Sequence, residues 1–497
     1  MNYIGISNGF HDAAASLIDD RGNILFAGHS ERYSKHKNDS KLNVSLITDL
    51  LKHSTSSYQL HYYERPYMRF LRSLRSGESL DFTVFSKTKL IGKDIIKRIG
   101  DKKLHYHNHH LSHAAAGFQT SPFNHATVLI IDAIGEFDTI SIWDAEYDQN
   151  GNASYKQLYS KKYPNSLGLF YSAMTRVVGL HPMDEEYIMM GMAAYGKPIY
   201  TERMFEAFLH DKQNLEFKEN LHTGLDDDRH EFLFDADKMD VASSAQKFLE
   251  EMLETILALS KELGFSNNLV YGGGVALNCL ANRILGKYYD RVWIMPNPGD
   301  AGSSLGAAAL GYGGKLNWNN AYLGHMIKGN YPTVDVYDEL KKNKIVGVAS
   351  GRAEFGPRAL GNRSLLADPR GDDIKDKVNA IKRRQKFRPF APVILEEYAH
   401  EYFDMPKCWV DSRYMQIVAD CKYPDKFPAI VHYDNTSRVQ TVPKDGSGIR
   451  ELLEYWHYHT GCPMLLNTSL NIKGEPMVND RSDADRFQTK YNVKVFS

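Results

Sequence analysis

The sequence predicts an α/β protein of two domains, with boundaries at residues 1–325 and 340–497. Short runs of branched apolar residues, such as Ala126–Ile131 and Ile345–Ala349, are typical of buried strands. Glycine clusters lie directly between a predicted strand and a predicted helix, a pattern of ligand-binding α/β sheets. The segment Tyr312–Asp335 is rich in Gly, Asn and Tyr and is expected to be the linker. With 497 residues, 42% of them hydrophobic, the chain can form two substantial cores.

The N-terminal residues have the pattern of a β-hairpin. Strand-like segments at Tyr3–Ser7 and Ala13–Ile18 flank a turn that contains a glycine, and Asn23–Ala27 continues as a third strand. Such hairpins open the actin-like (ASKHA) fold, a two-lobed domain whose first turn faces the nucleotide phosphates. His11 and Asp12 lie in that turn. They are either catalytic or an ordinary solvated pair.

An arginine-rich segment follows the hairpin. Between Arg65 and Lys103 the chain carries eleven basic residues against four acidic ones. Helical spacing places one basic face on an amphipathic helix, formed by Arg65, Arg69, Arg72 and Arg75. This face is either simply solvated or binds a polyanion or a phosphate-bearing acceptor.

The segment His109–Glu136 carries the clearest chemical pattern. His109 and His113 are four residues apart, so on a helix both imidazoles lie on one face and can chelate one cation. The small residues Ala114–Gly117 let this helix approach a neighbour closely, and Asp132 comes at the end of a predicted strand. Two histidines and a carboxylate leave coordination positions open for water or substrate. The alternative is a His-rich surface turn.

Two glycine clusters extend this pattern. Gly272–Gly274 follow the predicted strand Asn268–Tyr271, where backbone N–H groups suit a phosphate or an adenosine. A second cluster, Pro298–Ala307, places Asp300 in a turn before a helix of small residues. The repetition favours nucleotide binding over simple close packing, and the matching setting makes Asp300 a further carboxylate for the cation that the histidines chelate.

Three other features of the first domain have simpler interpretations. Met189, Met190 and Met192 could form a soft-metal site, but core packing is favoured because methionine fills apolar gaps. Asp226–Asp228 is expected to be a helix cap or an exposed loop. Ala242–Gly264 has the pattern of a long amphipathic helix.

The second domain gathers arginines beside glycines and prolines, in Gly351–Ser364 and Lys382–Pro392. Rigid guanidinium forks in such surroundings suit phosphate oxygens. Near the end of the chain, Leu465–Pro476 is a short apolar strand that leads into hydroxyl and amide groups. We expect a ligand-facing loop there.

Composition narrows the class of protein. The net charge is -1, so no global field indicates a nucleic-acid or membrane protein. Four scattered cysteines without CxxC spacing argue for a reducing compartment, and against a disulfide framework or a zinc–thiolate site. The sequence has neither a signal-peptide pattern at its start nor an apolar segment of membrane-spanning length. We therefore expect a cytoplasmic protein.

Together these motifs resemble the O-carbamoyltransferases of the nodulation, cephamycin and tobramycin type, over nearly the whole chain. In that family an actin-like domain, related to the enzyme that makes threonylcarbamoyl-adenosine in tRNA, precedes an α/β domain similar to threonylcarbamoyl-adenylate synthase. The resemblance implies that the C-terminal domain forms carbamoyl-adenylate from carbamoyl phosphate and ATP with Mg²⁺. It also implies a metal site in the N-terminal domain, with Fe(II) or another divalent ion, where the carbamoyl group passes to an acceptor hydroxyl.

The resemblance assigns residues as well. The implied metal ligands are His109, His113, Asp132 and Asp300. The general base is His11, in the His11–Asp12 loop, and the nucleotide contacts are Gly273, Gly274 and Asn278. The Lys-x-Arg and Ser-x-Asn pairs of the synthase match Lys386 with Arg388 and Ser469 with Asn471. Further phosphate or nucleotide binders are Arg358, Arg438 and Asn467.

The chain departs from the family pattern in three places. Ala133 stands where the family usually has glycine, and Ile188 stands where a lysine is expected. The chain also ends soon after Phe487, earlier than most relatives, so the last strand or helix is expected to be missing.

The acceptor stays open at this stage. Neutral overall charge favours a sugar or natural-product alcohol, whereas the Arg65–Lys103 segment favours a hydroxymethylated pyrimidine base in DNA. The other expected partners are small-molecule co-substrates, with no membrane and with a homodimer left open. Two rival functions are a tRNA threonylcarbamoyl transferase-like enzyme and a non-enzymatic actin-like ATPase module.

Overall fold

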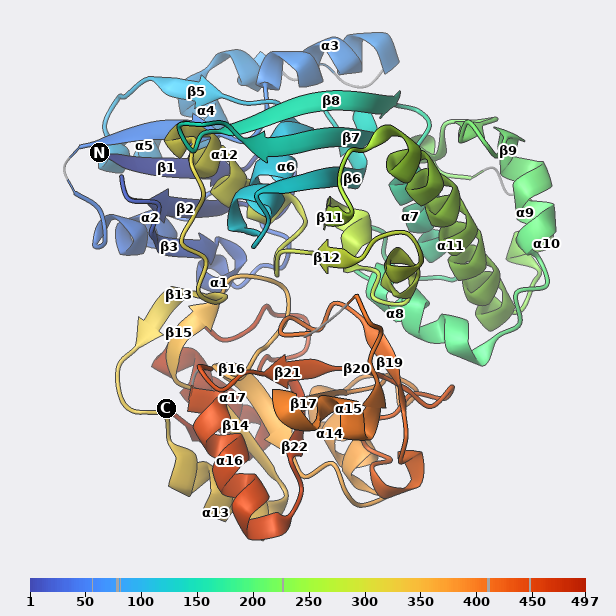
Figure 1. Cartoon of the computed structure of the whole chain (residues 1–497). Helices are drawn as coiled ribbons and strands as arrows, with labels where there is room; N and C mark the ends of the chain where they lie inside the picture. The colour runs from blue at the N-terminus through green and yellow to red at the C-terminus, as the bar shows by residue number, and fades with distance from the viewer. Residues whose placement is uncertain (56, 77–79, 81, 226–227, 409–411, 447) are drawn as a thin grey trace. The chain divides into compact units, whose positions relative to one another are not determined.

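The computed structural model describes residues 1–497 except 56, 77–79, 81, 226–227, 409–411 and 447. It is α/β throughout, as the sequence predicts (Figure 1). The chain forms two compact units. The first consists of Met1–Leu25 and Ser40–Trp318, and the second of Phe26–Asp39 and Asn319–Ser497. The sequence did not indicate that Phe26–Asp39 belongs with the C-terminal half.

The first unit holds two sheets of the same topology, although the edge strand β3 of one of them continues past Leu25 into the segment that belongs to the second unit. Their orders are β3-β2-β1-β4-β5 and β12-β11-β6-β7-β8. In each sheet the first strand is antiparallel to the next strand and parallel to a later one: β1 to β2 and β4, and β6 to β7 and β11. This duplication is the two-lobed, actin-like arrangement that the hairpin predicts. The strands are β1 Asn2–Ser7, β2 Ala14–Ile18, β3 Ile24–His29, β4 Tyr58–Tyr62, β5 Leu104–Tyr106, β6 His125–Gly135, β7 Asp138–Tyr147, β8 Ala153–Lys162, β11 Asn268–Gly272 and β12 Arg291–Trp293.

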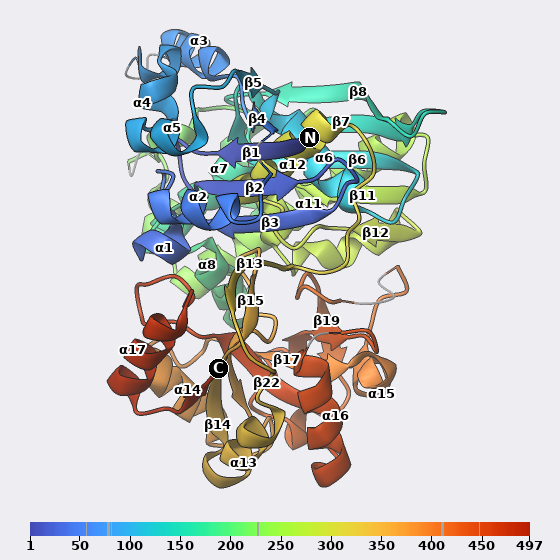
Figure 2. The same cartoon turned by 90° about the vertical axis from the view of Figure 1, so that its left-hand side faces the viewer.

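Two equivalent helices lie between the sheets, α6 (His109–Thr120) after β5 and α12 (Ser303–Tyr312) after β12. They approach each other closely through small residues. A Cβ atom on Gly306 would lie only 1.8 Å from the carbonyl oxygen of Ser112, so glycine is required there. Helix α12 also packs on β1 and β2, and Figure 2 shows it beside them.

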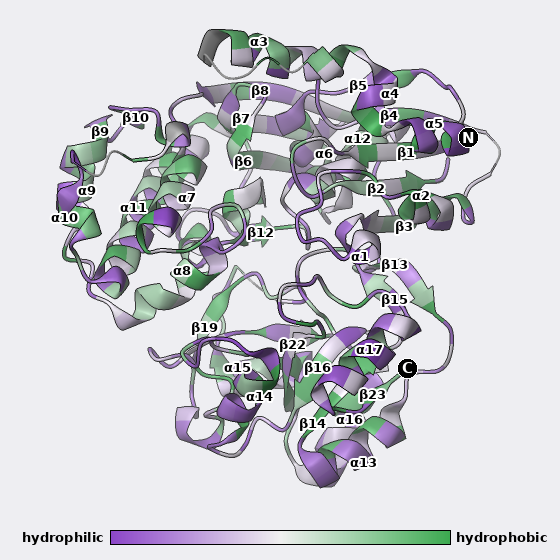
Figure 3. Ribbon diagram, turned by 180° about the vertical axis from the view of Figure 1, so that it is seen from behind, coloured by the Kyte–Doolittle hydropathy of each residue, from purple (hydrophilic) through white to green (hydrophobic). Residues whose placement is uncertain are grey.

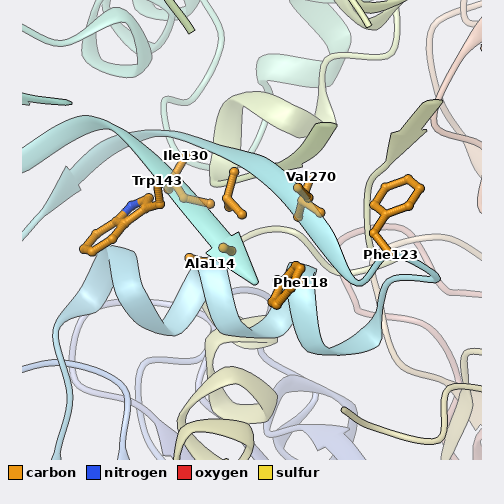
Figure 4. Packing of buried hydrophobic residues seen from close by; sticks show 9 residues of the cluster. Ala114, Phe118, Phe123, Ile130, Trp143 and Val270 are labelled. Atoms are coloured by element: carbon orange, nitrogen blue, oxygen red, sulfur yellow. The ribbon is translucent and has the colours of Figure 1, made fainter. Parts of the chain in front are cut away.

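The opposite side of α6 packs on the second sheet. Figure 4 shows Ala114 and Phe118 of α6 facing Ile130, Trp143 and Val270 of the strands. All five side chains are at most 7% exposed, and burial of each large apolar side chain contributes about 1.5–3 kcal/mol. This core fixes the helix that carries the two histidines against the strand that carries the carboxylate.

The other helices of the first unit surround these sheets. They are α2 Val44–Leu51, α3 Pro66–Ser76, α4 Lys87–Ile91, α5 Lys93–Ile99, α7 Leu167–Val177, α8 Glu186–Met192, α9 Thr201–Phe208, α10 Glu231–Phe234 and α11 Lys238–Leu263. The three methionines at 189, 190 and 192 are buried in the core, as expected. Asp226 and Asp227 lie outside the described residues, and Asp228 is exposed. Within the described part of the chain, none of the helices joins the length and the hydropathy that crossing a bilayer requires.

The second unit is centred on a six-stranded mixed sheet of order β21-β17-β22-β16-β14-β23. Its strands are β14 Ile345–Ala349, β16 Arg363–Ala367, β17 Ala391–Leu395, β21 Gln440–Val442, β22 Met464–Ser469 and β23 Val495–Phe496. Its longer helices are α13 Thr333–Asn343, α14 Ile374–Lys382, α16 Gly448–Thr460 and α17 Arg481–Tyr491. A small sheet is formed by β18 Phe403–Asp404, β19 Val418–Cys421 and β20 Thr436–Arg438.

One arginine of the Gly351–Ser364 segment is structural. The Arg363 side chain is fully buried, and its guanidinium donates hydrogen bonds to the carbonyl oxygens of Ser350, His325 and Asn479. Burial lowers its pKa to about 10, despite the favourable charge of Glu354. Arg363 therefore ties the start of β16 to the backbone after β14 and to two more distant segments, and its guanidinium is committed to these carbonyl groups.

A histidine pair makes the first unit sensitive to acid. His61 Nδ1 lies 2.9 Å from His107 Nε2. Burial, with the neighbouring histidines, lowers the pKa of His61 to about 3 and that of His107 to about 4. Since both values lie below the unfolded value of about 6.5, the stability that they contribute is complete above pH 6.5 and is lost as the pH falls toward 4.

We expect His107→Gln to remove part of this acid sensitivity. At pH 5.5, one unit below the unfolded pKa, each histidine that stays neutral in the folded state lowers the unfolding free energy by about 1.4 kcal/mol relative to high pH. The measurement is chemical unfolding of wild type and variant at pH 7.5 and 5.5. Between pH 7.5 and 5.5 the variant should lose about 1 kcal/mol less unfolding free energy than the wild type. Equal losses in the two proteins would contradict the role of His107.

Candidate functional site

Four side chains from three parts of the first unit converge on one point. The Nε2 atoms of His109 and His113 are 3.0 Å apart. One oxygen of Asp132 lies 3.3 Å from each of them, and so does one oxygen of Asp300. All four potential ligand atoms lie within 4.8 Å of one another. The structure thus brings together the two histidines of α6, the carboxylate in β6 and the carboxylate before α12.

Hydrogen bonds from neighbouring groups orient these potential ligands. The Oδ1 atom of Asp132 accepts hydrogen bonds from the N–H groups of Ala133 (2.9 Å) and Gly274 (3.2 Å), which leaves Oδ2 facing the histidines. The Nδ1 atom of His113 lies 3.0 Å from the Ser303 hydroxyl, so its Nε2 lone pair can face the centre of the cluster. Gly273 makes this geometry possible, because its φ is +87° and a Cβ there would lie 2.2 Å from a β6 carbonyl.

The electrostatics of the cluster favour a bound cation. Burial by itself lowers the pKa of His109, but Asp300, Asp132 and Glu64 raise it well above the usual value. Burial raises the pKa of Asp132, but His109 and His113 hold it well below its usual range. Two imidazoles and two carboxylates suit Fe(II), Mn(II) or Zn(II). The donor set, its convergence and its oriented lone pairs all fit a divalent ion.

His11 and Asp12 lie beside this cluster. His11 Nδ1 is 2.8 Å from an Asp12 oxygen, and its Nε2 is 3.6 Å from an Asp300 oxygen. Burial lowers the pKa of His11, but Asp300 and Asp12 outweigh it and raise the pKa to about 9. The turn that presents the imidazole requires a left-handed residue at Asp12, where φ is +53°. The predicted pair is therefore in place to exchange a proton at the cluster.

Sequence reasoning missed Glu64. Its side chain is almost fully buried just beyond β4, with one oxygen 3.2 Å from Arg69 and the other 3.8 Å from His109 Nδ1. Its position in the sequence could have indicated it. Glu64 comes two residues after β4, which is parallel to β1, so the ends of β1 and β4 lie at the same edge of the sheet.

Glu64→Gln should weaken metal binding. The carboxylate faces the non-ligating nitrogen of His109, and loss of such a partner typically lowers metal affinity by about 10- to 100-fold. Titration of the metal-depleted protein with Fe(II) or Mn(II) would measure this. Glu146→Gln, an exposed change on β7, serves as the matched control. Equal metal affinities for the wild type and Glu64→Gln would refute the role of Glu64 in metal binding.

A cavity of about 290 Å³ opens from the cluster. Three of the cluster residues, His109, Asp132 and Asp300, line it together with His11 and Glu64. The remaining wall comes from α7, from the segments around Met183 and Leu225, and from Phe10 and Phe234. The cavity is large enough for a compact organic substrate beside the cluster.

Three arginines in and just before α3 face inward. Arg65 forms an ion pair with Glu136 at 2.5 Å, Arg69 pairs with Glu64, and Arg72 donates to the Glu136 carbonyl at 3.1 Å. The Arg75 side chain lies outside the described part. The outer face of the helix instead exposes apolar side chains, and Figure 3 shows α3 with both hydrophilic and hydrophobic segments. The exposed apolar residues of α3 are Tyr67, Leu71 and Leu74. These three arginines thus do not form the solvated face that was one of the two interpretations.

The other predicted residues of the first unit have mainly structural contacts. Asn278 is buried, and its amide exchanges hydrogen bonds with Gln246 of α11 at 2.9 and 3.2 Å. Ile188, where a lysine was expected, is 3% exposed in the core, so an apolar residue fits there. Ala133 lines the cavity directly after Asp132.

The second unit holds a separate polar cluster around Lys382, which the sequence did not single out. The buried Lys382 ammonium donates to the Ser469 carbonyl at 2.6 Å and to the side-chain oxygen of Asn471. Burial lowers the pKa of Lys382 well below its usual value, and the nearby charges of Arg384, Arg388 and Lys37 lower it further. So many cations together favour a bound anion.

The predicted phosphate binders of this unit differ in their placement. Ser469 and Asn471 belong to the Lys382 cluster, and Arg388 is close enough to influence it. The Lys386 side chain is 85% exposed and lies 3.9 Å from Asp376. Arg358 and Arg438 are half-buried, and Arg438 Nε is a buried donor with no hydrogen-bond partner among the described residues. Asn467 is 1% exposed and donates to the Ala359 carbonyl and the Gln440 side chain.

With both clusters defined, the structure is that of an α/β protein with a buried group of potential metal ligands and a separate cluster around a buried lysine. The family model described as "Carbamoyltransferase N-terminus" matches residues 44–309, and that described as "Carbamoyltransferase C-terminus" matches residues 337–497. The chain therefore belongs to the carbamoyltransferase family and is a carbamoyltransferase.

Individual relatives agree with this assignment. Uncharacterized protein sll1178 of Synechocystis sp. is 33% identical, over 97% of this chain and 93% of the relative. Nodulation protein NolNO of Sinorhizobium fredii is 30% identical, over 97% and 77%. Nodulation protein NolO of Bradyrhizobium diazoefficiens is 33% identical, over 76% and 75%.

Solved structures resemble the chain only distantly. Component A of (R)-2-hydroxyglutaryl-CoA dehydratase from Acidaminococcus fermentans has a TM-score of 0.35 at 14% identity, over 63% of this chain and 98% of that one. HypF of T. kodakarensis has a TM-score of 0.33 at 13% identity, over 62% and 47%. No functional conclusion follows from this level of similarity.

Proposed function

We propose that the chain is an ATP-dependent O-carbamoyltransferase with two chemically distinct sites. Carbamoyl phosphate and ATP react in the second unit to give carbamoyl-adenylate. The carbamoyl group then passes to an acceptor hydroxyl at the four-residue cluster of the first unit. The convergence of His109, His113, Asp132 and Asp300 beside His11 is the observation that carries the proposal.

The first reaction needs cationic residues. Its overall balance consumes carbamoyl phosphate, ATP and one water, and it releases phosphate and pyrophosphate as the carbamate oxygen bonds to the α-phosphorus. Lys382 and Arg388 supply positive charge for the phosphoryl oxygens. Arg358 and Arg438 are further candidates, and the unpartnered Nε of Arg438 supports its part in binding.

The second reaction needs a base and a polarised carbamoyl group. A divalent ion at the cluster would offset the charge of Asp300 that raises the pKa of His11, so that the imidazole can be neutral. Neutral His11 then takes the proton of the acceptor hydroxyl while the hydroxyl oxygen bonds to the carbamoyl carbon, and the bond to the adenylate oxygen breaks so that AMP leaves. Asp12 orients the imidazole through its 2.8 Å contact. A divalent ion held by the two histidines and two aspartates would supply Lewis-acid chemistry at the carbamoyl group.

The two-step proposal can be tested directly. The purified protein is given ATP, Mg²⁺, carbamoyl phosphate and Fe(II), and pyrophosphate release is followed together with the masses of pooled acceptors. The pool contains sugar alcohols, natural-product alcohols and hydroxymethylated pyrimidines. Pyrophosphate release that depends on carbamoyl phosphate, with a mass gain of about 43 Da on an alcohol, supports the proposal, since a carbamoyl group replaces one hydrogen. Pyrophosphate release without carbamoyl phosphate would overturn it.

A further inference from the structure

The cavity beside the cluster is lined by three arginines, which differ in what they contact. Of its lining arginines, Arg69 is paired with Glu64, whereas Arg72 donates to a backbone carbonyl. The third, Arg176, is exposed at the cavity wall, and no carboxylate among the described residues pairs with it. The cavity carboxylates Asp132 and Asp300 are engaged with the histidines. Among the described residues that line the cavity, Arg176 is therefore the arginine left to pair with an anion.

Helix α7 fixes the distance of this charge from the cluster. The first turn of the helix is held against the end of β6, because the Ser166 hydroxyl donates to the Ala133 carbonyl at 2.7 Å. Leu169, Ser172, Ala173 and Arg176 recur at three- and four-residue spacing along the wall of the cavity. Seven residues separate Leu169 from Arg176, which is about 10 Å along the helix axis.

Part of the cavity wall is apolar and aromatic. Phe10 is 52% exposed, with its ring 5.1 Å from that of His11, and Phe234 is 37% exposed. Ile134 and Leu225 line the same region. Such a wall suits a flat or weakly polar ring, on which aromatic side chains can stack.

We propose that the acceptor is a phosphorylated alcohol with a flat ring between its hydroxyl and its phosphate, the chemistry of a hydroxymethylpyrimidine nucleotide. The hydroxyl lies at His11 and the metal cluster, the ring contacts Phe10 and Phe234, and the phosphate pairs with Arg176. This inference rests on the proposed function and adds the class of acceptor. The same chemistry occurs in a free nucleotide and in a DNA strand, so both sources belong in the test.

The test compares matched acceptors that differ by one phosphate. Carbamoylation of 5-hydroxymethyl-2′-deoxycytidine, of its 5′-monophosphate and of a short oligonucleotide containing it is followed by mass spectrometry. We expect kcat/KM for at least one phosphorylated form to exceed that of the nucleoside by about 10-fold or more, from a charge-assisted contact. Preference for the oligonucleotide over the monophosphate would identify a DNA strand as the source.

Variants assign the preference to Arg176. Arg176→Ala should lose most of the phosphate preference while the nucleoside reacts as before, and Arg176→Lys should retain part of it. Arg98→Ala, which removes an exposed arginine also in the last turn of its helix, should change neither acceptor.

Three outcomes would overturn the inference. The nucleoside could react as well as the phosphorylated forms. Arg176→Ala could lower kcat/KM equally for the nucleoside and both phosphorylated acceptors, which would mean that Arg176 contacts the carbamoyl-adenylate and not the acceptor. A protein that forms carbamoyl-adenylate could carbamoylate none of the three acceptors. Absence of carbamoyl-phosphate-dependent pyrophosphate release would instead contradict the proposed function itself.

Discussion

His113→Ala should stop carbamoyl transfer while leaving carbamoyl-adenylate formation within about twofold of the wild type. His113 is buried in α6, and its Nε2 atom lies 3.3 Å from both Asp132 and Asp300. Its removal leaves one imidazole and two buried carboxylates. We expect transfer to fall by at least about 100-fold, because a lost transition-state contact of this kind costs about 3–4 kcal/mol.

Two assays on the same preparation measure adenylate formation and carbamoyl transfer separately. Pyrophosphate release reports the first reaction, and carbamoylated acceptor reports the second. His125→Gln is the matched control, because this histidine is partly exposed on β6 and pairs with Asp144 away from the cluster. Circular dichroism and the unfolding midpoint identify a variant that has failed to fold, and His113→Gln then replaces it. Equal loss of both reactions in a folded variant would contradict the two-site scheme.

Local patterns were enough to predict most of the cluster. The four-residue spacing of His109 and His113 requires only that the segment be helical, and Asp132 requires only that a buried strand end there. Asp300 was predicted because its position in the sequence is similar to that of Asp132, and because the resemblance to O-carbamoyltransferases implies a ligand there. Each of these depends on a short stretch of chain, so the sequence carries it directly.

Contacts between distant segments were harder to predict. Periodicity showed that α3 has a basic face and an apolar face, but it did not show which one is buried. The described arginines of the basic face are turned inward because Glu64 and Glu136, which lie just beyond the ends of β4 and β6, meet them as buried carboxylates. That pairing spans 71 residues for Arg65 and Glu136, so no local pattern contains it.

The second unit shows a similar limit. The sequence offers two lysines within the Lys382–Pro392 segment, and spacing relative to an arginine fits both. In the structure Lys382 is the last residue of α14 and is 7% exposed, whereas Lys386 is four residues further on and projects to solvent. The end of a helix decides which lysine is buried, and helix ends are the least predictable feature of a sequence.

Lys382→Met should abolish carbamoyl-adenylate formation, whereas Lys386→Ala should reduce it less than about threefold. The Lys382 ammonium is positioned by Ser469 and Asn471 and lies among other cations, so a phosphoryl group would meet positive charge at this point. Loss of one preorganised donor to a developing charge typically lowers a rate by about 100- to 1,000-fold. Lys386 is solvated, and its weak contact with Asp376 supports no comparable effect.

Pyrophosphate release in the presence of carbamoyl phosphate compares the two lysine variants. Methionine keeps the length and the apolar stem of Lys382, and the unfolding midpoint shows whether the contacts with Ser469 and Asn471 were needed for folding. Lys382→Arg distinguishes charge from shape, because a guanidinium that restores activity would mean that positive charge at this point is the requirement. If Lys386→Ala lost as much activity as Lys382→Met, the phosphoryl group would bind on the exposed side of the segment, and the buried lysine would be structural.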